Sequence, residues 1–182
     1  MIEGEKVRLT ALSSEFLPEY RRWINDPEVA DFLASIGFPL SLAEERQWLE
    51  RMRRSGEYAT HFTIVTKSGE RIGNIALMDI NYLNRNAQLG IMIGERDHWG
   101  KGYGKDAICT LLDYAFGTLC LNKVDLKLNV ENKRALACYE KCGFKLEGKK
   151  RKQIFYRGRY CDELIMGILK EDWEKAKSKR KA

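Results

Sequence analysis

The stretch WGKGYGKDA, residues 99–107, stands between an apolar run and an apolar helical pattern. It places three glycines and two lysines within a few positions. Glycines let a backbone turn tightly and approach a ligand closely, and the free amides at a helix N-terminus attract anions. The lysines add positive charge without a fixed geometry. The stretch is therefore typical either of an anion-binding loop or of a plain strand-to-helix turn.

Two well-known phosphate-binding patterns do not fit this stretch. The loop of nucleoside triphosphatases requires Ser or Thr after its Gly-Lys pair, and neither Gly-Lys pair here is followed by one. The dinucleotide pattern requires GxGxxG and an acid about 20 residues later, at the end of the second strand. The glycines here alternate, and Asp125, the acid near that distance, lies inside an expected strand. We therefore expect neither ligand.

Hydrophobic periodicity on either side of the loop predicts a mixed α/β sheet layered with helices. We expect strands at 6–12, 59–66, 71–80, 86–94, 123–130, 144–156 and 160–170, with helices at 14–31 (one or two, short), 40–56, from the loop to about Leu119, and 133–142. Antiparallel strands thus precede two strand–helix units, which is typical of a single α/β domain. We assign that domain to residues 1–182, with a basic C-terminal tail at about 174–182.

Composition narrows the class of protein. The chain of 182 residues is 44% hydrophobic and 32% charged, as in globular proteins, and no apolar run approaches the roughly 20 residues that span a bilayer. Its N-terminus lacks a signal-type apolar segment, so we expect a cytoplasmic protein with no membrane partner. The five cysteines form no CxxC pair and there are two histidines, so we expect small buried thiols and no metal site.

The net charge of +6 is concentrated in two segments. Residues 145–159 hold seven basic residues and one acid, and residues 170–182 hold six basic residues and three acids. These segments contribute +9, so the remainder of the chain carries −3. They are either solvated surfaces or a docking patch, and we do not expect nucleic acid as the main partner.

A second segment, NVENKRALACYEKCGF at 129–144, places Tyr139 seven residues after Asn132. Seven residues are nearly two helical turns, so both side chains project from the same side of a helix. Each also has a structural explanation, with Asn132 as an N-cap and Tyr139 as a core residue. Gly143 is then the glycine that stops the helix.

The loop, its helix, the next strand and the pattern NxxAxxxYxxxGF together resemble the GNAT superfamily of acetyl-coenzyme A-dependent N-acetyltransferases. The segments RRWINDPEV (21–29) and YRGRYCDELIMGILKEDW (156–173) resemble the branch of ribosomal-protein-alanine and spermidine acetyltransferases. This resemblance implies a mixed, mostly antiparallel sheet with flanking helices, splayed at the coenzyme-binding strands. It implies transfer of acetyl from acetyl-CoA to a primary amine, by direct attack through a tetrahedral intermediate. The resemblance leaves open whether the acceptor amine belongs to a protein N-terminus, a polyamine, an amino sugar or an antibiotic. It also leaves open whether the chain forms a homo-oligomer.

The resemblance also implies where the coenzyme binds. The backbone of the strand GIMIG at 90–94 would pair with the pantetheine arm, and one of its amides would stabilise the oxyanion. Backbone amides after it would hold the pyrophosphate, and an asparagine would bond the coenzyme or a neighbouring water. The implied coenzyme residues are Met92, Ile93, Gly100, Lys101, Gly102, Tyr103, Gly104, Lys105 and Asn132.

For catalysis, the resemblance implies that Tyr139 protonates the departing thiolate as a general acid. This sequence has Trp99 where the family's loop usually has Gln or Arg, and Gln88 where the branch often has Glu. An amide is no base, so we expect Gln88 to hold a water. Asp79 at its strand end is then either the base or a solvated acid.

The acceptor amine should enter between the N-terminal helices and the strand ends. Trp23, Phe32 and Phe38 either line this pocket or belong to the core. The alternative function is a binding module that keeps the coenzyme fold. It would dock on ribosomal RNA through 145–159 and the tail, where Phe155 and Tyr156 could stack on bases.

Overall fold

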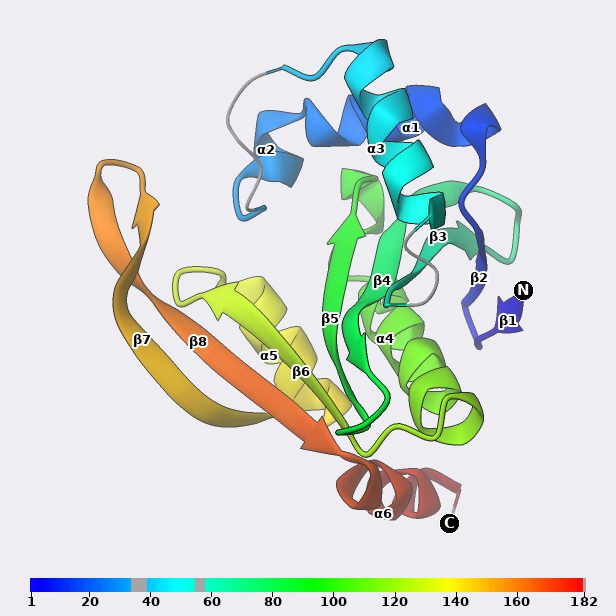
Figure 1. Ribbon diagram of the computed structural model, residues 1–182, viewed down its shortest axis with the longest axis vertical. Coiled ribbons are helices and arrows are strands. Elements are labelled where there is room, and N and C mark those ends of the chain that lie inside the picture. Colours follow the sequence, from blue (N-terminus) through cyan, green and yellow to red (C-terminus); the bar gives the residue numbers. More distant parts are fainter. Residues whose placement is uncertain (34–38, 55–57, 182) are drawn as a thin grey trace.

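The computed structural model describes residues 1–33, 39–54 and 58–181 (Figure 1). One sheet of eight strands runs in the order β1-β2-β3-β4-β5-β6-β8-β7. Its strands are β1 (Ile2–Glu3), β2 (Val7–Ala11), β3 (Thr60–Thr66), β4 (Arg71–Asn81), β5 (Asn86–Ile93), β6 (Lys123–Asn129), β7 (Lys145–Tyr156) and β8 (Arg159–Leu169). All neighbours are antiparallel except β5 and β6. The expected α/β class with a mostly antiparallel sheet is confirmed.

The two parallel strands separate soon after they meet. β5 and β6 pair at three positions only, Asn86 with Lys123, Ala87 with Val124, and Gln88 with Asp125. Beyond this vertex β5 continues along β4 and β6 continues along β8. Figure 1 shows the two strands diverging upward from the vertex. The expected splay is therefore present.

Helices flank the sheet. In Figure 1, α1, α2 and α3 lie across the upper ends of β4 and β5, and α6 lies below β8. The α-helices are α1 (Leu17–Ile24), α2 (Pro27–Ala30), α3 (Leu42–Arg54), α4 (Tyr103–Asp113), α5 (Lys133–Cys142) and α6 (Lys170–Lys181). Short 3-10 turns occupy Ser14–Phe16 and Arg96–His98. None of the helices in the described segments is long and apolar enough to cross a membrane.

Two apolar clusters hold these layers together. The larger lies between the sheet and α4, where the residues that repeat every four positions, including Ala107, Leu111 and Ala115, are buried. The smaller lies beneath α1 and α3 and contains Trp23 and Leu49. Burial of each large side chain contributes about 1.5–3 kcal/mol relative to leaving it exposed.

Local signals set several boundaries as the sequence predicts. The Ser41 hydroxyl accepts from the Glu44 N–H, and the Glu44 carboxylate accepts from the Ser41 N–H at 2.7 Å, which is a capping box at the start of α3. Asn132 caps α5 by accepting from the Ala135 N–H, and Gly143 ends it at φ 101°. Residues 157–158 both have positive φ, as a two-residue hairpin turn requires.

The end of α4 and the C-terminal segment differ from the expected elements. The helix after the loop was expected to run to about Leu119, but it changes after Asp113 into a π-helical turn (Tyr114–Thr118). Residues 174–181, expected as a tail, are later turns of α6. The Trp173 indole and the Lys177 ammonium both donate to the Asp113 carboxylate, at 3.0 and 2.6 Å. These contacts dock α6 against α4, and the basic C-terminal segment is helical as far as Lys181.

Candidate active site

The glycine loop presents an open helix N-terminus. Gly100 and Gly102 have φ values of 71° and 87°, which side chains rarely adopt. Gly102 is the N-cap of α4 and supplies no side chain to cap its amides. The N–H groups of the first turn are therefore available to an anion. Lys101 and Lys105 are exposed beside them.

The backbone of β5 offers an unpaired edge to the splay. The Gly94 N–H donates to the Ile72 carbonyl on β4, whereas the Arg85 carbonyl accepts from the Asn122 N–H at the start of β6. Backbone groups alternate between the two edges of a strand, so those of Ile91 and Ile93 face the splay. Those of Met92 face β4. The structure thus brings the backbone of Ile93 to the opening but not that of Met92, whose side chain packs beneath α1 and α3.

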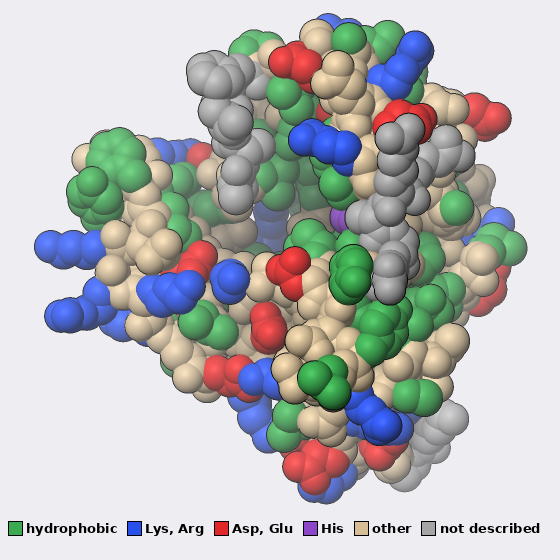
Figure 2. Space-filling view, viewed as in Figure 1, with side chains coloured by type: hydrophobic (Ala, Val, Ile, Leu, Met, Phe, Trp, Pro, Cys, Tyr) green, Lys and Arg blue, Asp and Glu red, His purple; other side chains and the backbone are tan. Residues whose placement is uncertain are grey.

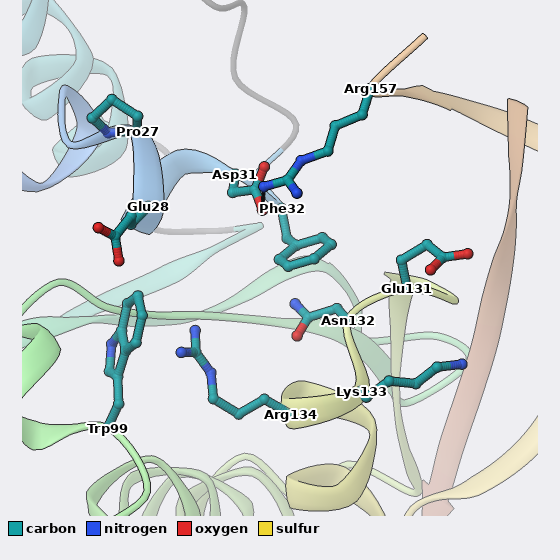
Figure 3. Close-up of a pocket in the computed structure, with 10 residues that line it drawn as sticks. All are labelled: Pro27, Glu28, Asp31, Phe32, Trp99, Glu131, Asn132, Lys133, Arg134 and Arg157. Atoms are coloured by element: carbon teal, nitrogen blue, oxygen red, sulfur yellow. Dashed lines mark hydrogen bonds and ion pairs between the residues drawn. The ribbon is translucent and has the colours of Figure 1, made fainter. Parts of the chain in front are cut away.

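Trp99 connects the loop to both sides of the splay. Its indole N–H donates to the Ile93 carbonyl at 2.8 Å. The Arg134 guanidinium carbon lies 3.6 Å from the centre of its ring, a cation–π contact between the loop and α5 (Figure 3). Trp99 therefore replaces the family's polar residue with a ring that fixes the end of β5 and holds an arginine of α5.

A cavity of about 530 Å³ opens beside this stack. It lies between α2, the loop, the start of α5 and the tip of the β7–β8 hairpin (Figure 3). Its lining residues are Pro27, Glu28, Asp31, Phe32, Trp99, Glu131, Asn132, Lys133, Arg134 and Arg157. Two of the residues predicted from the sequence, Phe32 and Asn132, are among them.

Acids and arginines meet around the cavity. The Asp31 carboxylate accepts from the Tyr156 hydroxyl at 2.7 Å and from Arg157 at 3.0 Å. Phe32 stacks on the Tyr156 ring with centroids 5.1 Å apart. These contacts hold the hairpin tip against the end of α2. Glu28 forms an ion pair with Arg96, and Glu131 forms one with Arg159.

Tyr139 projects from α5 into the core and is 8% exposed. Its ring packs edge-on against Phe144, with centroids 5.9 Å apart. Burial raises the pKa of the Tyr139 hydroxyl above its ordinary value, because the phenolate would be poorly solvated. The hydroxyl is therefore protonated at neutral pH, as a general acid must be before it acts.

A family model of the acetyltransferase (GNAT) domain matches residues 6–145. The chain belongs to the GNAT acetyltransferase family. It is 38% identical to the spermidine N(1)-acetyltransferase of Vibrio cholerae over 112 residues, 62% of this chain and 64% of that relative, just under two thirds of its length. It is 35% identical over 106 residues to YdaF of Bacillus subtilis, named as a ribosomal N-acetyltransferase, with 58% and 57% covered.

Similarity to solved structures extends over nearly the whole GNAT acetyltransferase. The spermidine N-acetyltransferase of Vibrio cholerae, solved with CoA and spermine, superposes with a TM-score of 0.85 at 30% identity. That comparison covers 93% of this chain and 98% of the other. The chain is accordingly an acetyltransferase whose co-substrate is acetyl-CoA. Among the described residues, no group of three His, Cys, Asp or Glu is arranged to hold a metal ion.

The geometry of this GNAT acetyltransferase fits the coenzyme. The uncapped amides of α4 and the two loop lysines suit a pyrophosphate. Gly104 packs against Ile93, where an added Cβ would lie 3.7 Å from the isoleucine side chain. The unpaired edge of β5 offers hydrogen-bonding groups to the amides of a pantetheine arm. The coenzyme would thus enter between two strands that the protein itself leaves apart.

Two side chains expected at the acceptor site or as its base, Trp23 and Asp79, have other places. Trp23 is fully buried and donates to Glu95 at 2.8 Å, so it is a core residue and not a pocket wall. Asp79 is exposed in a β-bulge at φ 51°, at the end of β4 opposite the glycine loop. Phe38 lies outside the described residues.

The vertex of the splay holds a pair that the sequence did not reveal. The Gln88 side-chain amide donates to the Asp125 carboxylate at 3.5 Å, and both side chains are half-buried. The sequence presents Asp125 as an acid within a strand, and only the register of β5 against β6 places it opposite Gln88. No local signal marks this juxtaposition.

A cluster of thiols was also missed. The Cys142 thiol is hydrogen-bonded to the thiols of Cys109 and Cys138, and these hydrogen bonds, followed by burial, raise the pKa of the Cys142 thiol. Cys142 is fully buried. The cluster packs α4 against α5 next to Tyr139 and so fixes the position of the phenol. The expectation of small buried thiols holds for Cys142 and Cys161, whereas Cys109 and Cys138 are half-buried and Cys120 is exposed.

Proposed function

We propose that this acetyltransferase moves the acetyl group of acetyl-CoA to a primary amine of a polyamine such as spermidine. The observation that carries the proposal is the cavity beside the splay, whose wall presents the carboxylates of Glu28, Asp31 and Glu131. A flexible polycation needs several carboxylates spaced around one opening. Each of these carboxylates has an arginine partner that an ammonium group of the substrate can replace. The resemblance to spermidine acetyltransferases supports the same substrate class.

The chain's own groups supply the parts of the reaction. The first amides of α4, with Lys101 and Lys105, hold the pyrophosphate. A backbone N–H of Ile91 or Ile93 faces the splay, where it would polarise the thioester carbonyl and stabilise the oxyanion. The neutral amine attacks the carbonyl carbon, the C–S bond breaks, and the Tyr139 hydroxyl gives its proton to the departing sulfur.

A thiol-release assay against a panel of amines tests this proposal. The panel contains spermidine, spermine, peptides with free N-termini, glucosamine and an aminoglycoside, and mass spectrometry identifies each acetylated product. We expect the highest kcat/KM for spermidine or spermine, at least about tenfold above any peptide, because the cavity wall offers three carboxylates to the ammonium groups of a polyamine. A preference for peptide N-termini would contradict the polyamine and favour a protein substrate.

The RNA-docking alternative is weakened by contacts within the hairpin. Lys149 pairs with Asp162 at 3.0 Å and Lys150 pairs with Glu163 at 3.3 Å. Part of the basic charge of β7 is thus balanced by acids of β8. Binding of RNA that falls steeply with added salt would support the alternative. We expect no such binding at physiological ionic strength.

A further inference from the structure

The vertex of the splay places one carboxylate on the face away from α4. Register partners on neighbouring strands project their side chains to the same face. Ala87 and Leu89 of β5, and Val124 of β6, are buried in the core cluster against α4. Gln88 and Asp125 alternate with them and therefore project from the opposite face, at the last position where β5 and β6 pair.

Asp125 is half-buried, and its surroundings hold a second carboxylate and a lysine. Gly167, its partner on β8, carries no side chain, and the Glu147 carboxylate lies over that glycine. Lys123 donates to Glu147 at 2.6 Å, so this nearby cation is engaged with a different acid. The hydrogen bond of Asp125 goes to the neutral amide of Gln88, which leaves its negative charge uncancelled by that contact.

The pair offers what an acceptor amine needs. Gln88 donates through its amide nitrogen to Asp125, and a side-chain amide also carries an oxygen that can accept a hydrogen bond. A carboxylate and an amide oxygen side by side suit an ammonium group or its water. We propose that Asp125 binds the acceptor amine at the vertex and accepts its proton before transfer. This inference rests on the proposed amine acetylation.

The proton balance of the step is as follows. Asp125 takes one proton from the bound ammonium, which gives the neutral amine. Its nitrogen forms the C–N bond, the C–S bond breaks, and the nitrogen loses its second proton to solvent water. The thiolate takes the proton of Tyr139. Asp125 then loses a proton to solvent and Tyr139 regains one, so each turnover releases a single proton.

The decisive variant is Asp125→Asn, which preserves the size of the side chain and its ability to accept from Gln88. With spermidine as the acceptor at pH 7.5, we expect kcat/KM to fall about a hundredfold. The affinity for CoA, measured by calorimetry, should stay within about twofold. The deficit should shrink as pH rises toward 10, because solution then supplies the neutral amine. Asp125→Glu should recover at least about tenfold over Asp125→Asn.

Glu147→Gln is the matched control, since it removes the carboxylate of β7 that lies over Gly167, the partner of Asp125 on β8. We expect its kcat/KM to stay within about twofold of the wild-type value. The inference is wrong if Asp125→Asn keeps full activity, if its deficit is equal at every pH, or if it also loses CoA binding. It is also wrong if Asp79→Asn, and not Asp125→Asn, gives the pH-dependent loss.

These outcomes are distinct from failure of the polyamine proposal. If the wild-type protein acetylates another amine in the panel, the polyamine is wrong, and the same variants are compared on that amine. If it acetylates no amine although it binds CoA, both the proposed function and the role of Asp125 are wrong.

Discussion

At the scale of single residues, the ring of Tyr139 has a packing role and its hydroxyl has a proposed catalytic role. The ring packs against Phe144, and the hydroxyl is the proton donor of the proposed reaction. Tyr139→Phe keeps the packing and removes the proton. We expect kcat to fall at least about a hundredfold while CoA affinity and the melting temperature change little. Steady-state kinetics and calorimetry measure the two effects, and unaltered turnover across the amine panel would show that Tyr139 is only a core residue.

The same side chain predicts a feature of the pH profile. Burial raises the pKa of the Tyr139 hydroxyl above its ordinary value near 10. The acid form therefore persists as pH rises, and its loss begins only above the range where a free phenol ionises. We expect kcat of the wild-type protein to show no decline between pH 8 and about 10. A declining limb in that range, absent from Tyr139→Phe, would mean that the phenol titrates normally.

The residue scale is also where prediction from sequence reached its limit. Asn132 and Gly143 act on their own helix, so a linear pattern suffices to place them. Trp99 meets Arg134, a contact between two segments that come together only in the folded chain. Trp23 lies on an amphipathic helix, and periodicity alone does not separate a pocket wall from a core residue. Roles that depend on register or on distant partners were accordingly missed.

At the scale of elements, one carboxylate ties α4 to the first long strand. Asp106, in the first turn of α4, accepts from the backbone N–H groups of Glu5, Lys6 and Val7, at 3.2, 2.8 and 2.9 Å. These bonds fix the helix whose N-terminus is the proposed coenzyme site. Asp106→Ala would leave the three donors without their acceptor. We expect a loss of about 2–3 kcal/mol in the free energy of unfolding, measured with urea.

Asp97→Asn is a suitable control for this measurement, because Asp97 is exposed in the preceding 3-10 turn. Its stability should lie within about 0.5 kcal/mol of the wild-type value. Equal stability of Asp106→Ala and the wild-type protein would show that water replaces the carboxylate without cost.

Elements themselves were well predicted where their signals are local. The hairpin of β3 and β4 and the capped helix α5 appear within a residue or two of their expected ends. Their boundaries depend on turns and caps within the segment. The end of α4 and the docking of α6 depend on Asp113, which meets Trp173 and Lys177 from far along the chain. The charged sequence of α6 gives no sign that the helix packs against the rest of the protein. Its docking depends on tertiary contacts, which local propensity does not reveal.

At the scale of the whole molecule, coenzyme bound in the splay as proposed would add to the stability of the folded protein. A ligand that binds only the folded state at a hundredfold excess over its Kd stabilises by about 2.7 kcal/mol. For a chain of this length we expect CoA to raise the melting temperature by about 5–10 °C. Hydrogen exchange should show new protection at the amides of Ile91 and Ile93. The Met92 amide, already facing β4, should change little, and equal changes at all three would contradict the assigned edge.

The short contact between β5 and β6 has a further consequence in evolutionary terms. Three residue pairs join the strands of the two parts of the sheet, which share one buried core. The loop that meets the coenzyme belongs to the first part, and the hairpin tip that closes the cavity belongs to the second. Mutation can therefore remodel the tip for a new acceptor while the coenzyme loop keeps its geometry. The splay that would admit the coenzyme thus also separates it from the hairpin tip, where a change of acceptor could arise.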